Sequence, residues 1–138
     1  MAEVGALVSG RRTFERAGGW GGQHPWDIPA FVAAHDVPEG WPRPGSTIEF
    51  VTDGIESAVA RAKSAAGSKS VMVHGAQTIQ QCLDAGLLDE LHIDLAAVLL
   101  GGGVRLFDQL ANAPVVLGSP TVVTGVGVTH LRYPVHRS

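Results

Sequence analysis

Two adjacent arginines, Arg11 and Arg12, follow a glycine at the end of a short apolar run. The run, residues 4–8, is long enough for a buried strand, and Gly10 lets the backbone approach a ligand closely. Arginine donates forked hydrogen bonds that suit phosphate oxygens, and the helix expected after Gly10 offers free backbone N–H groups to an anion. The segment therefore indicates phosphate binding. A solvated arginine pair is the alternative, although arginine at a helix start is electrostatically disfavoured without an anion.

A second candidate anion site is the turn around Gly75. Residues 70–74 predict a buried strand, and the pattern from Gln77 to Ala85 predicts a helix that follows the glycine. Such a strand–glycine–helix turn can hold a phosphate at the helix N-terminus. It lacks the three spaced glycines of a dinucleotide fingerprint and the lysine of a phosphate loop. An ordinary turn, with a hydrogen-bonded His74 at the end of the strand, is the alternative.

Three consecutive glycines, residues 101–103, follow a long strand pattern over residues 89–100. Glycines in a row cost backbone entropy, so they indicate either a tight turn or a ligand that lies against the main chain. The other chemical patterns are absent from the sequence. The six histidines and one cysteine show no zinc-type spacing, there is no Gly-x-Ser-x-Gly elbow, and Cys82 is placed in an apolar helix.

The composition fits a single globular domain. The chain has 138 residues, 45% of them hydrophobic and 17% charged, with 18 glycines and a net charge of −3. The small negative charge supplies no broad basic surface for duplex nucleic acid. A single cysteine excludes an intrachain disulfide and fits a reducing compartment, and no apolar run is long enough to span a membrane. We therefore expect a cytoplasmic protein with no nucleic-acid or membrane partner.

Strand-like and helix-like segments alternate along the chain. This alternation predicts an α/β fold with a mostly parallel central sheet, flanking helices and a C-terminal antiparallel hairpin through Gly125. One helix is expected over residues 55–66, opened by Asp53 or Ser57. Strands are expected at residues 4–8, 31–34, 47–52, 70–74, 89–100, 115–117, 120–124 and 127–135, and residues 16–30 and 38–45 read as connections that contain Trp20, Trp26 and Trp41. These tryptophans either cap the core edge or line a pocket.

Six stretches, in this order, resemble the dihydrofolate-reductase-like superfamily. The resemblance is specifically to small bacterial proteins related to the C-terminal reductase domain of the riboflavin-biosynthesis deaminase-reductase. The stretches cover nearly the whole chain. They are residues 10–15 (GRRTFE), 50–58 (FVTDGIESA), 74–81 (HGAQTIQQ), 85–92 (AGLLDELH), 98–108 (VLLGGGVRLFD) and 127–133 (GVTHLRY).

The resemblance implies one dihydrofolate-reductase-like domain over residues 1–138, which binds NADPH across the carboxyl ends of its parallel strands. The resemblance implies four groups of cofactor contacts. Gly10, Arg11, Arg12 and Thr13 would meet the phosphates, and Ala34 and His35 would lie near the 2′-phosphate. Thr52 and Asp53 would lie near the adenine, and Gly75, Ala76, Gln77 and Thr78 would hold the pyrophosphate. No metal is implied.

The sequence departs from the family pattern in two places. His74 stands where relatives often carry a glycine, which places a side chain where backbone usually approaches the cofactor. Relatives usually have several tens of residues before the strand that precedes Gly10, and these supply a first strand, a helix and much of the substrate pocket. The chain therefore looks truncated at its N-terminus, and neither the substrate nor a catalytic residue can be named from it.

The resemblance implies an NADPH-dependent reductase that transfers hydride to a small heterocyclic substrate. Two alternatives stay open: an inactive nucleotide-binding or structural remnant of that family, and a small-ligand module that uses the tryptophan-rich loop. Among the acids, Asp27 is the nearest candidate for a proton donor because Trp26 and Ile28 flank it, and a solvated loop acid is its alternative. We also expect a homodimer that involves strands around residues 122–133.

Overall fold

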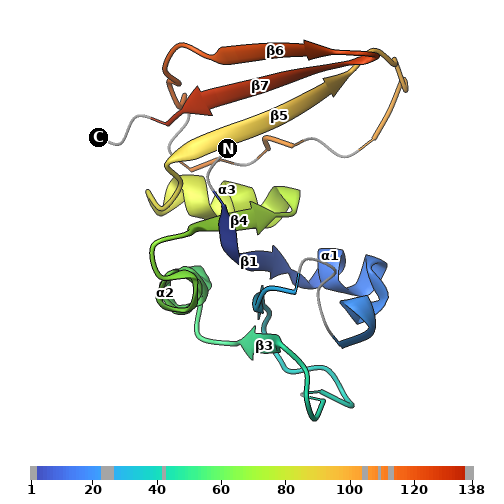
Figure 1. Ribbon diagram of the computed structural model, residues 1–138, viewed down its shortest axis with the longest axis vertical. Coiled ribbons are helices and arrows are strands. Elements are labelled where there is room, and N and C mark those ends of the chain that lie inside the picture. Colours follow the sequence, from blue (N-terminus) through green and yellow to red (C-terminus); the bar gives the residue numbers. More distant parts are fainter. Residues whose placement is uncertain are drawn as a thin grey trace.

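The computed structural model describes residues 3–22, 27–41, 43–103, 106–108, 110–111 and 114–135. The chain forms two separate β-sheets with helices packed on the larger one (Figure 1). Its elements in chain order are β1 (Val4–Gly10), α1 (Arg11–Arg16), the 3₁₀ turn η1 (Gly18–Gly22), β2 (Ala30–Ala33), β3 (Ile48–Val51), α2 (Ile55–Ala66), β4 (Ser70–His74), α3 (Ala76–Asp84), β5 (Glu90–Ala96), β6 (Thr121–Gly125) and β7 (Val128–Pro134).

The larger sheet has four strands in the order β3-β2-β1-β4, and all its pairings are parallel. This arrangement confirms the expected α/β fold with a mostly parallel central sheet. Since all four strands run the same way, their carboxyl ends meet at one edge. In this sheet that edge carries Gly10, Ala33, Val51 and His74.

Alternating residues of the parallel strands fill a core on each face of the sheet. On one face Ala6 and Val8 of β1 pack with the buried alanines of α2, among them Ala58 and Ala62. Ala58 and Ala62 lie one turn apart, and their small side chains let the helix approach the sheet closely. The periodic apolar pattern over residues 55–66 is therefore confirmed as a helix, although Gly54 rather than Asp53 or Ser57 occupies its N-cap.

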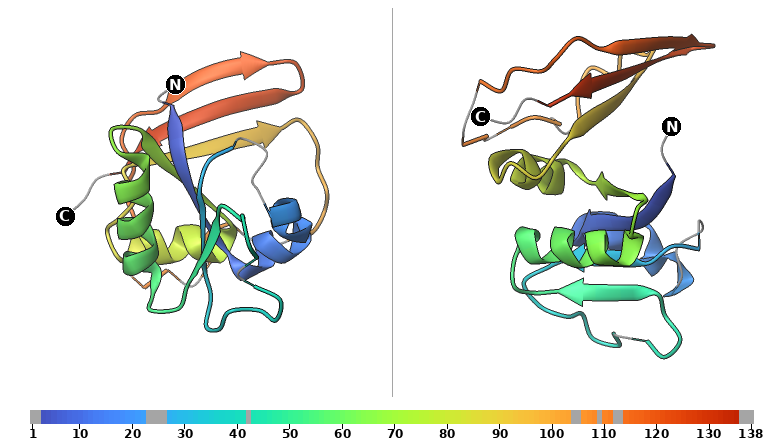
Figure 2. Two further views of the ribbon diagram at one scale, coloured as in Figure 1. Left: turned by 60° about the horizontal axis from the view of Figure 1, so that its bottom comes forward. Right: turned by 60° about the vertical axis from the view of Figure 1, so that its left-hand side comes forward.

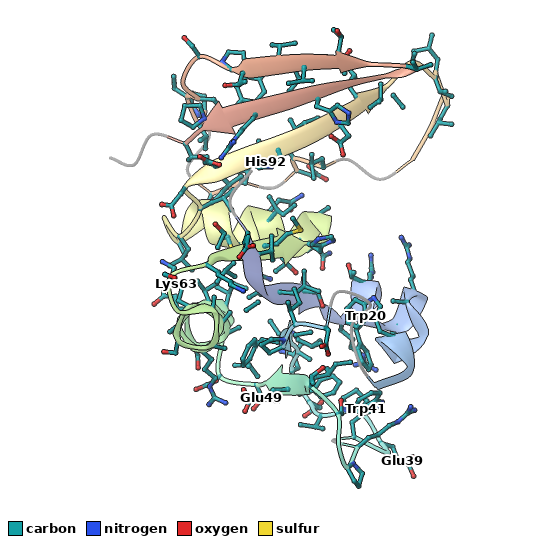
Figure 3. All side chains as sticks on the ribbon, in the orientation of Figure 1. Trp20, Glu39, Trp41, Glu49, Lys63 and His92 are labelled. Atoms are coloured by element: carbon teal, nitrogen blue, oxygen red, sulfur yellow. The ribbon has the colours of Figure 1, made fainter. Side chains whose placement is uncertain are left out.

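Aromatic rings fill the opposite face, where Leu7 of β1 also lies. Phe14 of α1 is the centre of this cluster, with edge-on ring contacts to Trp41 at 5.0 Å, Phe50 at 4.9 Å and Trp20 at 6.1 Å. Trp20 and Trp41 both lie on the side of the sheet next to α1 (Figure 3). Both tryptophans pack against the edge of this core, and Trp20 also lines a pocket with Gly21 and Arg43, so Trp20 fills both of the expected roles. Trp26 lies outside the described residues.

The smaller sheet is antiparallel and has the order β5-β7-β6. Val126 and Gly127 form the two-residue turn between β6 and β7, and Gly127 has a positive φ of 72°, which glycine adopts readily. The expected C-terminal hairpin is thus confirmed, but Gly125 ends β6 instead of making the turn. The hairpin also pairs with β5 in a sheet of its own and does not continue the parallel sheet.

Two expected strands of this region are shorter in the structure. The strand pattern over residues 89–100 ends at Ala96, because the Ala97 N–H makes its cross-strand hydrogen bond to the Gly127 oxygen, where the hairpin turns back. The strand expected at residues 115–117 is reduced to a single bridge between Leu117 and Val135. In the part of the chain that the structure describes, no helix is long and apolar enough to cross a membrane.

Candidate functional site

Two strand-to-helix turns lie side by side at the carboxyl edge of the parallel sheet. Gly10 ends β1 and leads directly into α1, while Gly75 connects β4 to α3. Since β1 and β4 are neighbours in the sheet, with Ser9 in register with His74, the two turns are adjacent (Figure 2). The two segments that sequence motifs singled out separately therefore form one site.

The centre of this site is packed so closely that only glycine fits. A Cβ atom on Gly10 would lie 2.6 Å from the Thr78 Oγ1 atom, and one on Gly75 would lie 2.9 Å from the Thr13 Oγ1 atom. Gly75 also has a φ of 99°, a backbone conformation that other residues rarely adopt. The backbone of the two turns therefore lies close to the hydroxyl groups of Thr13 and Thr78. A side chain at either glycine would collide with one of these hydroxyls.

Backbone N–H groups at the start of α3 are available to a ligand. The first intrahelical hydrogen bond runs from the Ile79 N–H to the Gly75 oxygen, so the amides of the three preceding residues have no acceptor within the helix. No side chain caps the helix and no acidic residue lies in its first turn. An anion is the group that this helix end would favour.

The two arginines differ in their surroundings. The Arg11 Nε atom lies 2.6 Å from a carboxylate oxygen of Glu15, one turn along α1. Arg12 is exposed, and among the described residues no carboxylate lies within 4.0 Å of its guanidinium. Arg12 can therefore bind a phosphate without first breaking an ion pair.

The remaining expected residues lie along the same edge. Ala34 follows β2 and donates its N–H to the Val51 oxygen at 3.1 Å, and His35 next to it is exposed. Thr52 and Asp53 directly follow β3 and are exposed. The twelve residues expected to contact a cofactor therefore all lie at or just beyond the carboxyl ends of the four strands, or in the first turn of α1 or α3.

Ser9 is a residue of the site that sequence reasoning did not select. It is fully buried, and its Oγ atom has no hydrogen-bond partner among the described residues. A buried hydroxyl without a partner is costly, and such groups are rare in native structures. The sequence carried one signal, since Ser9 is a polar residue at the end of an apolar strand and next to Gly10.

The other candidates do not join this site. A Cβ atom on any glycine of the run 101–103 would meet no atom within 4 Å, so close backbone packing does not account for the run. Asp27 is exposed, with a φ of 54°, and Trp26 beside it is outside the described residues. Burial raises the pKa of the Cys82 thiol to about 11, which makes it a poor nucleophile. No group of metal-ligating side chains occurs within the described residues.

Comparison with known proteins gives a family match and two structural matches. The family model described as the RibD C-terminal domain matches residues 46–136. A protein assigned to riboflavin biosynthesis in Shewanella sp. PV-4 superposes with a TM-score of 0.72 at 29% identity, over 98% of this chain and 76% of its own. A pyrimidine reductase-like protein of Corynebacterium diphtheriae superposes with a TM-score of 0.66 at 13% identity, over 98% of this chain and 77% of its own, and shows the fold alone.

A curated relative matches a shorter part of the chain. The uncharacterized protein YwjB of Bacillus subtilis is 31% identical over 65 residues, which are 47% of this chain. The matched part spans 37% of the length of that relative.

Proposed function

The chain belongs to the RibD C-terminal domain family, a family of riboflavin-pathway reductase-like domains, and on that basis we propose that it binds NADPH at the carboxyl edge of its parallel sheet. The observation that carries this proposal is the close approach of Gly10 to Thr78 and of Gly75 to Thr13. These contacts keep side chains away from the free amides of α3. Backbone N–H groups at a helix start, without acceptors inside the helix, favour the binding of a pyrophosphate.

We assign different parts of the cofactor to different residues at the carboxyl edge of the sheet. The amides of Ala76, Gln77 and Thr78 would hold the pyrophosphate, and Arg12 would pair with a phosphate because no carboxylate of the described residues competes for it. When bound, NADPH supplies the hydride of a reduction, and the protein supplies binding and orientation. The substrate class that we propose is a small heterocycle of the pterin or pyrimidine type.

Titration of the purified chain with NADPH tests the proposal. We expect saturable binding by equilibrium dialysis, and weaker binding of NADH, which lacks the 2′-phosphate. Circular dichroism should first confirm that the protein is folded. A folded chain that shows no saturable NADPH binding would contradict the proposed function.

Cofactor binding without turnover is the second candidate function. It is favoured by the position of the acids: among the described residues, no Asp or Glu side chain is buried, as a proton donor in a water-excluded pocket would be. NADPH oxidation by the purified chain with dihydrofolate or a ribosylaminopyrimidine would exclude this candidate. Binding without oxidation would support it.

We also propose that the chain forms a homodimer through β6 and β7. Val122 and Val123 on β6 are 53% and 57% exposed, and β6 is an edge strand, which proteins normally cover or protect with charge. Light scattering at micromolar concentration should give twice the monomer mass of 14.4 kDa. A monodisperse monomer would contradict the homodimer.

A further inference from the structure

The last residue of β4 is a histidine at the carboxyl edge of the larger sheet. His74 directly precedes Gly75, and it is in register with Ser9 of β1. Two residues earlier, Leu7 and Met72 are in register as well, and both pack on the sheet face that carries the aromatic rings. Because side chains alternate between the two faces of a strand, Ser9 and His74 point to this same face.

Ser9 and His74 are polar neighbours on this face. Val32 of β2 is in register with Ser9 on its other side, so His74 is the polar one of the two residues that flank Ser9 in the sheet. Ser9 is fully buried and His74 is partly buried. The Ser9 hydroxyl has no hydrogen-bond partner in the part of the chain that the structure describes. A hydroxyl beside an imidazole can bond to one ring nitrogen and so fix the direction in which the other nitrogen points.

The order of the strands indicates which half of NADPH would reach His74. The strands follow one another as β3-β2-β1-β4 (Figure 1). A pyrophosphate at the turns after β1 and β4 therefore directs one half of the nucleotide toward β2 and β3 and the other half toward the end of β4. The ends of β2 and β3 carry the exposed polar residues His35 and Thr52, which suit a solvated adenosine half. The partly buried His74 suits the nicotinamide, because shielding a reacting ring from water prevents side reactions.

The neighbouring polar side chains already have a contact or an assigned role. The hydroxyls of Thr13 and Thr78 lie close to the two glycines of the site. Arg11 is held in an ion pair within α1, and Arg12 is the proposed phosphate ligand. His74 has no part in the binding described so far. Its imidazole carries an N–H donor in both the neutral and the charged form, and the carboxamide of a nicotinamide offers an acceptor oxygen to such a donor.

We propose that the His74 imidazole donates a hydrogen bond to the carboxamide oxygen of the nicotinamide ring, and that Ser9 is the positioning residue that orients this imidazole. The inference rests on the proposed binding of NADPH at the carboxyl edge of the sheet. His74 would fix the rotation of the ring and hence the direction in which the ring presents its hydride. Because Ser9 and His74 belong to paired strands, the sheet would hold both side chains in place.

Proton NMR of the histidine rings in the native chain tests the contact with the nicotinamide. The two probes are NADPH and 2′-phospho-ADP-ribose, which has the same phosphates and adenosine but no nicotinamide. The signals that disappear in His74→Gln identify His74 among the six histidines. We expect NADPH to shift the His74 ring signals and to give cross-peaks between them and the nicotinamide protons. The probe without nicotinamide should bind and leave the His74 signals unchanged.

Equilibrium dialysis of variants measures the strength of the contact. His74→Ala should weaken NADPH binding by about 2- to 12-fold, which corresponds to the loss of one hydrogen bond, and should leave the binding of 2′-phospho-ADP-ribose unchanged. His74→Gln keeps an N–H donor and should lose less affinity for NADPH. His35→Ala is the control, because His35 lies at the end of β2 on the adenosine side. It should weaken the binding of both probes by the same factor.

The role of Ser9 is tested by the balance of the two His74 ring tautomers, which nitrogen NMR of the ring measures. Ser9→Ala should change this balance and weaken the binding of NADPH but not of 2′-phospho-ADP-ribose. Val32→Ala alters the other, equally buried neighbour of Ser9 and should leave the tautomers of His74 as they are. An unchanged balance in folded Ser9→Ala would remove Ser9 from the inference.

The two probes separate a failure of the inference from a failure of the proposed function. Equal shifts of the His74 signals with both probes, or equal losses of affinity for both in His74→Ala, would overturn the contact with the nicotinamide while NADPH binding stands. A folded native chain that binds neither probe would contradict the proposed function and the inference together. The spectra of the native chain decide the matter if His74→Ala does not fold.

Discussion

Gly75→Ala should reduce NADPH affinity by about tenfold or more, which corresponds to a loss of about 1.4 kcal/mol. The added Cβ atom would lie 2.9 Å from the Thr13 Oγ1 atom and 3.9 Å from the Gly10 nitrogen. It would therefore push apart the two turns that meet at the carboxyl edge of the sheet. Equilibrium dialysis of the variant with NADPH measures the effect directly.

Gly67→Ala is the matched control for this variant. Gly67 ends α2 and also has a positive φ, 63°, but a Cβ atom there would meet no atom within 4 Å. Both substitutions force an alanine into a backbone conformation that costs roughly 1–3 kcal/mol, so both should lower the free energy of unfolding. The loss should be larger for Gly75→Ala, because only its Cβ atom also meets the Thr13 hydroxyl. Only Gly75→Ala should weaken NADPH binding. An equal loss of affinity in both folded variants would remove Gly75 from the site.

The elements of the larger sheet were predictable because their patterns are local. Residues 70–74 are an apolar run between turn residues and form β4 as expected, and residues 55–66 carry the helical period that places Ala58 and Ala62 against the sheet. The end of β5 was not predictable in this way. Residues 97–100 stay apolar in sequence, and the strand ends at Ala96 because the turn at Gly127 removes its partner.

That the turns at Gly10 and Gly75 form one site could be predicted only from the order of the strands in the sheet. Gly10 and Gly75 are far apart in sequence and carry weak motifs, but parallel neighbours must end at one edge, which joins the two turns. The contacts between individual side chains could not be predicted from the sequence. Among the described residues, the Ser9 hydroxyl has no partner, and Glu15 pairs with Arg11 while no carboxylate lies beside Arg12. These features depend on distances that sequence spacing does not give.

Arg12→Ala should weaken NADPH binding by roughly 10- to 150-fold, because a charged hydrogen bond to a phosphate contributes about 1.5–3 kcal/mol. The binding of NADH should fall much less if Arg12 contacts the 2′-phosphate. Arg11→Ala should have the smaller effect of the two, since the Arg11 guanidinium already shares its charge with Glu15 at 2.6 Å. Dialysis with each cofactor separates these outcomes.

Arg16→Ala provides the control on the same helix. Arg16 lies in the last turn of α1, away from Gly10, and its removal takes the same charge from the protein. A change in overall charge would therefore weaken NADPH binding equally in Arg12→Ala and Arg16→Ala, whereas a contact with the cofactor would appear only in Arg12→Ala. Losses of the same size for NADPH and NADH in Arg12→Ala would reject the 2′-phosphate contact. They would instead place Arg12 at the pyrophosphate, next to the free amides of α3.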